Sequence, residues 1–295
     1  MNQVKQSRYN IDTCAMLVEV NVRQWTARKL DKTTTEEVLI GKGAGSKGAA
    51  RVNKHLLAGR PELETINQCV GSIRTYLYDV TLPWSDSGLR LLTTAKFMEF
   101  NQRMQDYEDE FNALVDDFVT TYPTLITAQA MALGDMFNRN EYPTPDDIKH
   151  RFDFRVNYMP VPTSGDFRVD VGNDAQAELQ KKLASLADER IEHAMLDIKT
   201  RLKDHLKRMS DRLTVDYAGQ KAQPRMFHAS LLDTAQELCS LAKDLNITGD
   251  SDLEDARIKL HNAIDGMELN DLRKDLDTRH AVKKDVDAIL SNLSF

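Results

Sequence analysis

The chain has 295 residues, of which 41% are hydrophobic and 29% charged, and its formal net charge is −7. This length allows one large hydrophobic core or two smaller ones, and the composition excludes a disordered chain. No run of about eighteen apolar residues is present, and the opening MNQVKQSRYN lacks the apolar segment of a secretory signal, so we expect a cytoplasmic protein without a membrane span.

The cysteines and the charge distribution narrow the class of protein that this chain can belong to. Cys14, Cys69 and Cys239 are scattered and never form a C-x-x-C pair, which argues against a disulfide framework and a zinc site. The acidic net charge gives no global attraction for nucleic acid. Residues 23–60, however, carry nine lysines and arginines against three acids, whereas residues 61–150 carry six bases against fifteen acids. This asymmetry either steers an anionic partner or reflects two solvated faces.

Three segments alternate apolar and polar residues and predict strands: 14–23, 152–158 and 167–171. The last two form a predicted hairpin, which is only marginally stable alone, so we expect the first strand to join it. The prediction is an antiparallel sheet of about three strands. Its long-range pairing closes residues 1–172 into an α+β head domain.

Helices are expected between these strands. Pro61 suits the first turn of one helix, and an aromatic stripe predicts a longer helix over 94–121. A third helix should follow Pro123, and Thr144 should cap a short fourth one.

From residue 173 to 295 the pattern becomes purely helical. Leucines at helical spacing predict one helix over about 174–213, and its narrow apolar stripe requires a partner helix from this chain or from a second subunit. Further helices should follow a turn at 219–224, one of them capped by Ser251. The expected fold is therefore α+β and mostly helical, with a C-terminal helical arm, either an antiparallel bundle or a coiled coil.

The segment IGKGAGSKGAAR, residues 40–51, contains G-x-G-x-x-G at 43–48 and resembles a P-loop. A dinucleotide fingerprint needs a parallel sheet around it, and the flanking residues predict helices instead. The P-loop reading fails because Ser46 and Gly48 stand where a glycine and a hydroxyl are required. We therefore expect no nucleotide site and no catalytic site, and we predict that the chain is not an enzyme.

Two interpretations of this loop remain open: a flexible surface connector, or a phosphate-binding loop leading into a helix over 49–56. In the second, backbone amides at the helix start and nearby bases would hold nucleic-acid phosphates. The candidate residues are Lys42, Gly43, Gly45, Lys47, Gly48, Arg51 and Lys54.

A second basic surface is possible at the end of the long helix, although a solvated flank needs no function. Its residues are Lys199, Arg201, Lys203, Lys207, Arg208 and Arg212. His193 lies between Glu189 and Asp197 on one helix face, but no second histidine supports a metal site, so we expect neither metal nor cofactor.

Several stretches resemble an uncharacterised protein family of phages and integrative elements, over about the first 210 residues. These stretches are the early strand ending in Trp25, Arg51-Val-Asn-Lys54 after the glycine-rich segment, Leu82-Pro-Trp-Ser-Asp-Ser-Gly-Leu-Arg-Leu-Leu92, Leu133-Gly-Asp-Met-Phe137, and Tyr142-Pro143 leading to Phe152 and Pro160-Val-Pro162. The resemblance implies no catalytic residues. It implies a bacterial host cell and genes often encoded beside a MoxR-type AAA+ ATPase and a von Willebrand A-type protein.

Two functional hypotheses follow. The first is a non-enzymatic interaction or assembly protein, an adaptor of a MoxR-type ATPase module that binds a protein partner or itself through the long helix. The alternative is a nucleic-acid-binding protein of phage DNA replication or recombination that uses the basic glycine-rich loop.

Overall fold

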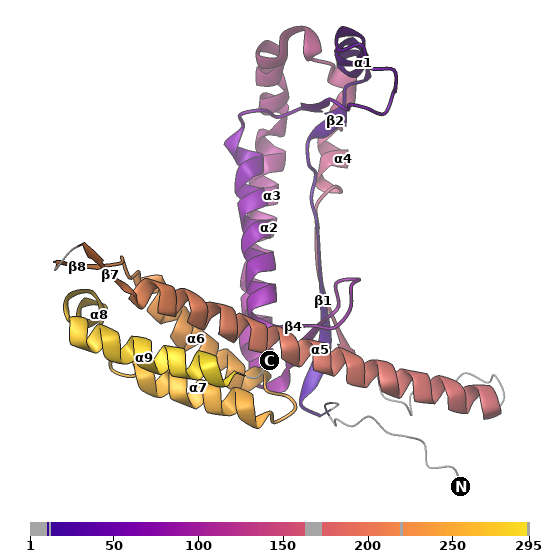
Figure 1. Ribbon diagram of the computed structural model, residues 1–295. Helices are drawn as coiled ribbons and strands as arrows, with labels where there is room; N and C mark the ends of the chain where they lie inside the picture. The colour runs from indigo at the N-terminus through magenta and orange to yellow at the C-terminus, as the bar shows by residue number, and fades with distance from the viewer. Residues whose placement is uncertain (1–10, 12, 163–172, 219–220, 294–295) are drawn as a thin grey trace. The chain divides into compact units, whose positions relative to one another are not determined.

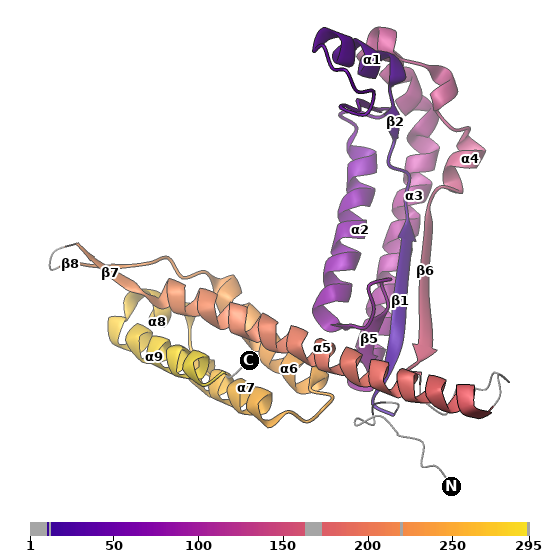
Figure 2. The ribbon, with the colours of Figure 1, turned by 45° about the vertical axis from the view of Figure 1, so that its right-hand side comes forward.

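The computed structural model is drawn in two orientations in Figures 1 and 2. It describes residues 11, 13–162, 173–218 and 221–293. The predicted α+β, mostly helical fold class is confirmed, with a small antiparallel sheet and a long helix.

The chain forms two compact units, and each is assembled from segments that are distant in the sequence. Unit 1 comprises Met1–Glu19, Tyr78–Phe100 and Asn157–Phe295, and unit 2 comprises Val20–Leu77 and Asn101–Val156. The sequence predicted two domains with a single boundary after residue 172, and the division in the structure differs from that prediction. The reason is that strands from the first hundred residues share a hydrophobic core with the C-terminal helices within unit 1.

The main sheet has four strands in the order β4-β5-β1-β6. They are β4 (Leu82–Pro83), β5 (Arg90–Thr93), β1 (Ala15–Arg23) and β6 (Asp153–Pro160). β1 and β6 confirm two of the predicted strands, whereas the third, at 167–171, lies outside the described residues. β4 and β5 were not predicted. They are too short to show an alternating pattern, and β5 is buried at all four residues.

A helical bundle makes up the C-terminal part of unit 1 and confirms the predicted long helix. The helices are α5 (Asn173–Leu213), α6 (Ala229–Leu245), α7 (Ser251–Ile264), α8 (Leu269–Lys274) and α9 (Leu276–Asn292). α5 packs against α6 and α9, and α7 packs against both of those helices (Figures 1 and 2). The apolar stripe of the C-terminal part of α5 is thus covered by helices of the same chain.

Two details of this bundle correct the sequence predictions. Residues 221–224 of the expected turn form β8 (Lys221–Pro224), which pairs antiparallel with β7 (Val215–Ala218). The cap of α7 is Asp250 rather than Ser251, because the Asp250 side chain accepts a hydrogen bond from the Leu253 amide.

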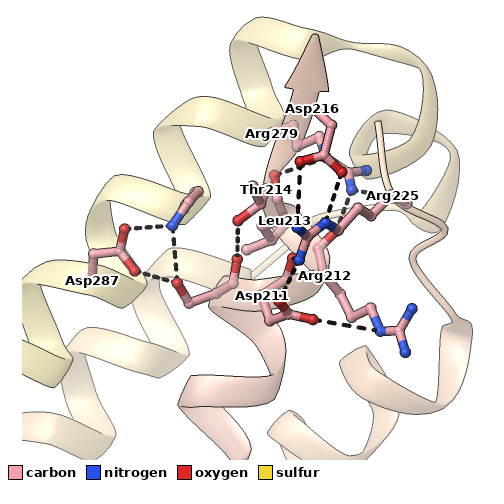
Figure 3. A network of polar contacts seen from close by, with 10 residues as sticks. Asp211, Arg212, Leu213, Thr214, Asp216, Arg225, Arg279 and Asp287 are labelled. Atoms are coloured by element: carbon pink, nitrogen blue, oxygen red, sulfur yellow. Dashed lines mark hydrogen bonds and ion pairs between the residues drawn. The ribbon is translucent and has the colours of Figure 1, made fainter. Parts of the chain in front are cut away.

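Arg279 on α9 is 1% exposed and closes the end of α5 (Figure 3). Its guanidinium donates to the carbonyl oxygens of Leu213 at 2.9 Å and Leu272 at 2.7 Å, and also to those of Arg212 and Arg225. The last carbonyls of a helix have no partner within the helix, so this side chain satisfies groups that burial would leave unpaired. The same burial lowers the pKa of Arg279 below its usual value.

Unit 2 contains most of α2 (Pro61–Val80) and α3 (Phe97–Leu133), which lie side by side (Figures 1 and 2). The Tyr76 and Tyr107 rings meet between them, with centroids 6.0 Å apart. The helix break expected near Pro123 was wrong, because α3 runs through this residue. A proline inside a helix costs about 3 kcal/mol, and the buried side chains on both sides of Pro123 offset that cost.

Candidate interaction surface at one end of unit 2

The basic segment of the sequence builds one end of unit 2 from two short strands and a helix (Figures 1 and 2). β2 (Arg28–Leu30) pairs antiparallel with β3 (Asn53–His55), and α1 (Lys32–Gly41) connects to β3 through the glycine-rich loop. Asp31 caps α1, because its side chain accepts a hydrogen bond from the Thr34 amide at 3.0 Å. The ribbon is antiparallel, and neither nucleotide fingerprint therefore has the parallel strand that it requires.

The helix expected over 49–56 is absent, and this corrects the predicted phosphate site. Residues 53–55 form β3 instead, and the Val52 carbonyl accepts from the Asp31 amide at 2.9 Å. The Val52 amide donates to Thr35 Oγ1 at 3.0 Å. Pairing with β2 and α1 outweighs the helical propensity of this segment. Among the described residues 49–56, no helix start remains to present amides to an anion.

The loop itself is exposed from Gly41 to Ala49. Gly43 has a φ of +63°, a left-handed conformation that favours glycine. Gly45 does not have such a φ, and a Cβ placed there would meet no atom within 4 Å. The backbone therefore requires glycine at only one of the two positions.

Lys54 is the predicted site residue that the structure removes from the surface. It is 7% exposed, and its Nζ lies 2.6 Å from Glu141 Oε2 and donates to the Met136 carbonyl, also at 2.6 Å. Tyr142 adds a bond from its hydroxyl to the Leu56 carbonyl at 2.8 Å. Lys54 thus fastens β3 to the segment after α3, and it is not available to a ligand.

Six bases remain exposed at this end, and the described residues hold no carboxylate in an ion pair with any of them. They are Arg28, Lys29, Lys32, Lys42, Lys47 and Arg51. Large apolar side chains are exposed among them: Ile40 is 80% exposed, Leu30 42% and Val38 39%. We call these nine residues the basic apolar end. Glu36 and Glu37 on α1 are also exposed, so the positive charge is not uniform.

The sequence contains a signal for the exposed apolar side chains of this end, although the sequence-based predictions did not use it. Val38, Leu39 and Ile40 are consecutive, and three successive helical residues point in different directions. Only Leu39 is buried. At the end of α3, Met131 is 90% exposed, and Met136 is 42% exposed just beyond it.

The second predicted basic surface, on α5, is built differently. Lys199 pairs with Asp250 at 2.6 Å, and Lys207 pairs with Asp204 at 3.4 Å. Arg212 lies 4.0 Å from Asp211, and Lys203 also has an interaction partner. For Arg208, which is exposed, the described residues give no ion pair. Lys199, Lys207 and Arg212 are therefore each paired with a carboxylate.

Arg201, the remaining member of that surface, is bound at both ends of its guanidinium. It pairs with Asp197 at 2.6 Å and donates to the carbonyls of Asp79 at 3.0 Å and Thr81 at 3.1 Å. These contacts make Arg201 a structural residue of unit 1.

Groups that could carry chemistry are poorly placed for it. Burial raises the pKa of the Cys69 and Cys239 thiols to about 11, which makes both weak nucleophiles. Burial also lowers the pKa of His205, whose Nε2 lies 3.0 Å from the Leu231 carbonyl. Within the part of the chain that the structure describes, no cluster of three His, Cys, Asp or Glu side chains could hold a metal ion. The helices of that same part include none that is long and apolar enough to span a bilayer.

Comparisons with known proteins found no relative of this chain. A scan against protein-family models gave no match, and searches of the curated proteins and of the solved structures gave none either.

Proposed function

We propose that this chain is a non-enzymatic adaptor that binds a protein partner through the basic apolar end of unit 2. The observation that carries the proposal is Ile40, an isoleucine 80% exposed among six bases that have no ion pair with any described residue. Exposed apolar side chains surrounded by charge are typical of protein-interaction surfaces, where an apolar anchor supplies affinity and the charged rim supplies specificity.

The chemistry of this surface favours a protein partner over a stacked nucleic-acid base. Its exposed apolar side chains, Leu30, Val38 and Ile40, are aliphatic, whereas base stacking uses aromatic rings. A complementary partner presents an apolar pocket with acidic residues around it. The resemblance noted in the sequence suggests a MoxR-type AAA+ ATPase of the bacterial cytoplasm as that partner. Self-association through α5 is a further option, since Leu186 is 40% and Leu196 50% exposed.

The test measures binding of the purified full chain to the MoxR-type ATPase from the same genome by calorimetry. Ile40→Ser should weaken binding about tenfold or more, because it removes a large apolar side chain from the contact. Met98→Ser is the matched control, since Met98 is 75% exposed but lies in unit 1. The adaptor proposal fails if the ATPase does not bind, or if the two variants weaken binding equally.

Nucleic-acid binding is the second candidate, and the six exposed bases favour it. Such binding should weaken steeply with salt, because each neutralised phosphate releases counterions. In fluorescence anisotropy with single- and double-stranded DNA, Lys47→Glu combined with Arg51→Glu should abolish binding at low salt. Lys182→Glu with Lys207→Glu on α5 is the matched control. Absence of binding by the unaltered chain at low salt would exclude this candidate.

A further inference from the structure

A cavity of about 420 Å³ lies where the β2–β3 ribbon meets the start of α2, entirely within unit 2. Arg28 and Arg60 contribute the positive charges of its lining, and His55 lines it as well. Ala27, Leu57 and Leu63 contribute apolar walls. A volume in this range suits a small organic ligand, and apolar walls with a few polar groups are typical of such sites.

Arg60 gives the first sign that the cavity receives a ligand. Its Nε is buried, and no acceptor for it exists among the residues that the structure describes. Buried donors are nearly always satisfied, and arginine keeps its charge at all physiological pH values. The unsatisfied nitrogen belongs to a planar fork of donors that fits a carboxylate in a bidentate manner.

Ala27 gives the second sign, because its backbone has a φ of +50°. Residues with a Cβ rarely adopt this conformation, and non-glycine examples concentrate at functional sites. The Ala27 carbonyl is held in place by the Leu56 amide at 2.7 Å. The strained residue thus forms part of the cavity wall, directly before Arg28.

The charges of the lining identify the kind of anion. Arg28 and Arg60 carry two positive charges, and Glu64, which is exposed, contributes one negative charge. The remaining single positive charge matches one carboxylate better than a phosphate dianion. We propose that this pocket binds a carboxylate attached to a small apolar body, carried by a free organic acid or by the C-terminus of a protein. Its occupancy does not require the partner docking proposed above.

The probe for this site is N-acetyl-leucine, with N-acetyl-leucinamide as an uncharged control of nearly the same shape. Titration of the ¹⁵N-labelled full chain should produce saturable shifts at the amides of residues 27, 28, 55–60, 62 and 63 with the acid only. Inorganic phosphate should bind more weakly than the acid. Equal effects of the acid and the amide, tighter binding of phosphate, or no saturable shift with the acid would each overturn the proposal.

Substitutions assign the effect to the guanidinium groups. Arg28→Met should lower the affinity for N-acetyl-leucine about tenfold, the range expected for a lost hydrogen bond to a charged group. Lys29→Met is the matched control, because successive strand residues point to opposite faces and Lys29 does not line the cavity. Arg60→Met should have an equal or larger effect. Since Arg28 is exposed, its variant keeps the test valid even if the Arg60 variant does not fold.

A peptide that ends in a leucine carboxylate identifies the source of the ligand. Affinity at least tenfold above that of N-acetyl-leucine supports a protein C-terminus, and equal affinity supports a free acid. If Arg28→Met and Lys29→Met lower the affinity equally, the pocket is not the site. Loss of ATPase binding in the Ile40 variant would leave these outcomes unchanged, so the two proposals can fail separately.

Discussion

The bundle of unit 1 and the basic apolar end of unit 2 use cationic side chains in opposite ways. In the bundle, Arg279 is buried and donates hydrogen bonds to four backbone carbonyls. Arg201 on α5 pairs with a carboxylate and donates to two carbonyls. At the end of unit 2, six bases are exposed and unpaired among the described residues. The residue type is the same, but in the first region the charge holds backbone segments together and in the second it faces solvent. A count of basic residues in the sequence cannot separate these uses.

The largest expected effect comes from Arg279→Met. This change leaves the last carbonyls of α5 buried without a donor, and we expect it to lower the free energy of unfolding by about 3 kcal/mol or more. Urea denaturation followed by circular dichroism measures this loss. Arg212→Met is the control, because that side chain is half exposed and should change stability by less than about 0.5 kcal/mol. Similar losses of unfolding free energy in the two variants would mean that Arg279 stabilises the bundle no more than the half-exposed Arg212 does.

Lys54 is the exception in unit 2, and it should behave like the cations of the bundle. Lys54→Met leaves Glu141 without its partner in a largely buried site, so we expect a loss of about 2 kcal/mol in unfolding free energy. Adding Glu141→Gln should restore part of the loss, since the uncompensated carboxylate is then gone. If Lys54→Met alone is as stable as the unaltered chain, Lys54 is not a structural residue.

His205 predicts how the stability of unit 1 depends on pH. Burial lowers its pKa in the folded state, so the unfolded chain takes up the proton first as the pH falls. The folded state should therefore lose stability as the pH falls from the usual histidine pKa of 6.5 toward the lower folded value. Unfolding midpoints measured between pH 7.5 and 5 test this expectation. His205→Gln should reduce the change of the unfolding midpoint with pH. If this pH dependence is unchanged in the variant, groups other than His205 cause it.

The smallest effect is expected for the exposed bases. Lys47→Glu combined with Arg51→Glu should change the unfolding free energy by less than about 0.5 kcal/mol, because neither side chain has a partner among the described residues. Thermal and urea unfolding of this double variant are the measurements. A loss above 1 kcal/mol would mean that these bases stabilise the fold, which would weaken both proposals for this surface.

The sequence by itself determined the periodic features: the strands predicted at 14–23 and 152–158, which the structure shows as β1 and β6, the long helix and the helical C-terminal part. These segments carry enough regular apolar residues for local pattern to dictate structure. The prediction that no parallel sheet surrounds the glycine-rich loop also followed from local context, and the described strands next to the loop, β2 and β3, pair antiparallel.

Only the tertiary structure decided the rest, because long-range contacts outweighed local preference. Pairing with β2 made residues 53–55 a strand instead of part of a helix, and packing on both sides carried α3 through Pro123. The same contacts buried Lys54 against Glu141 and left Ile40 exposed. Such outcomes depend on residues far away in the chain, so neither the composition nor the spacing of the basic segment could have told a structural base from one available to a partner.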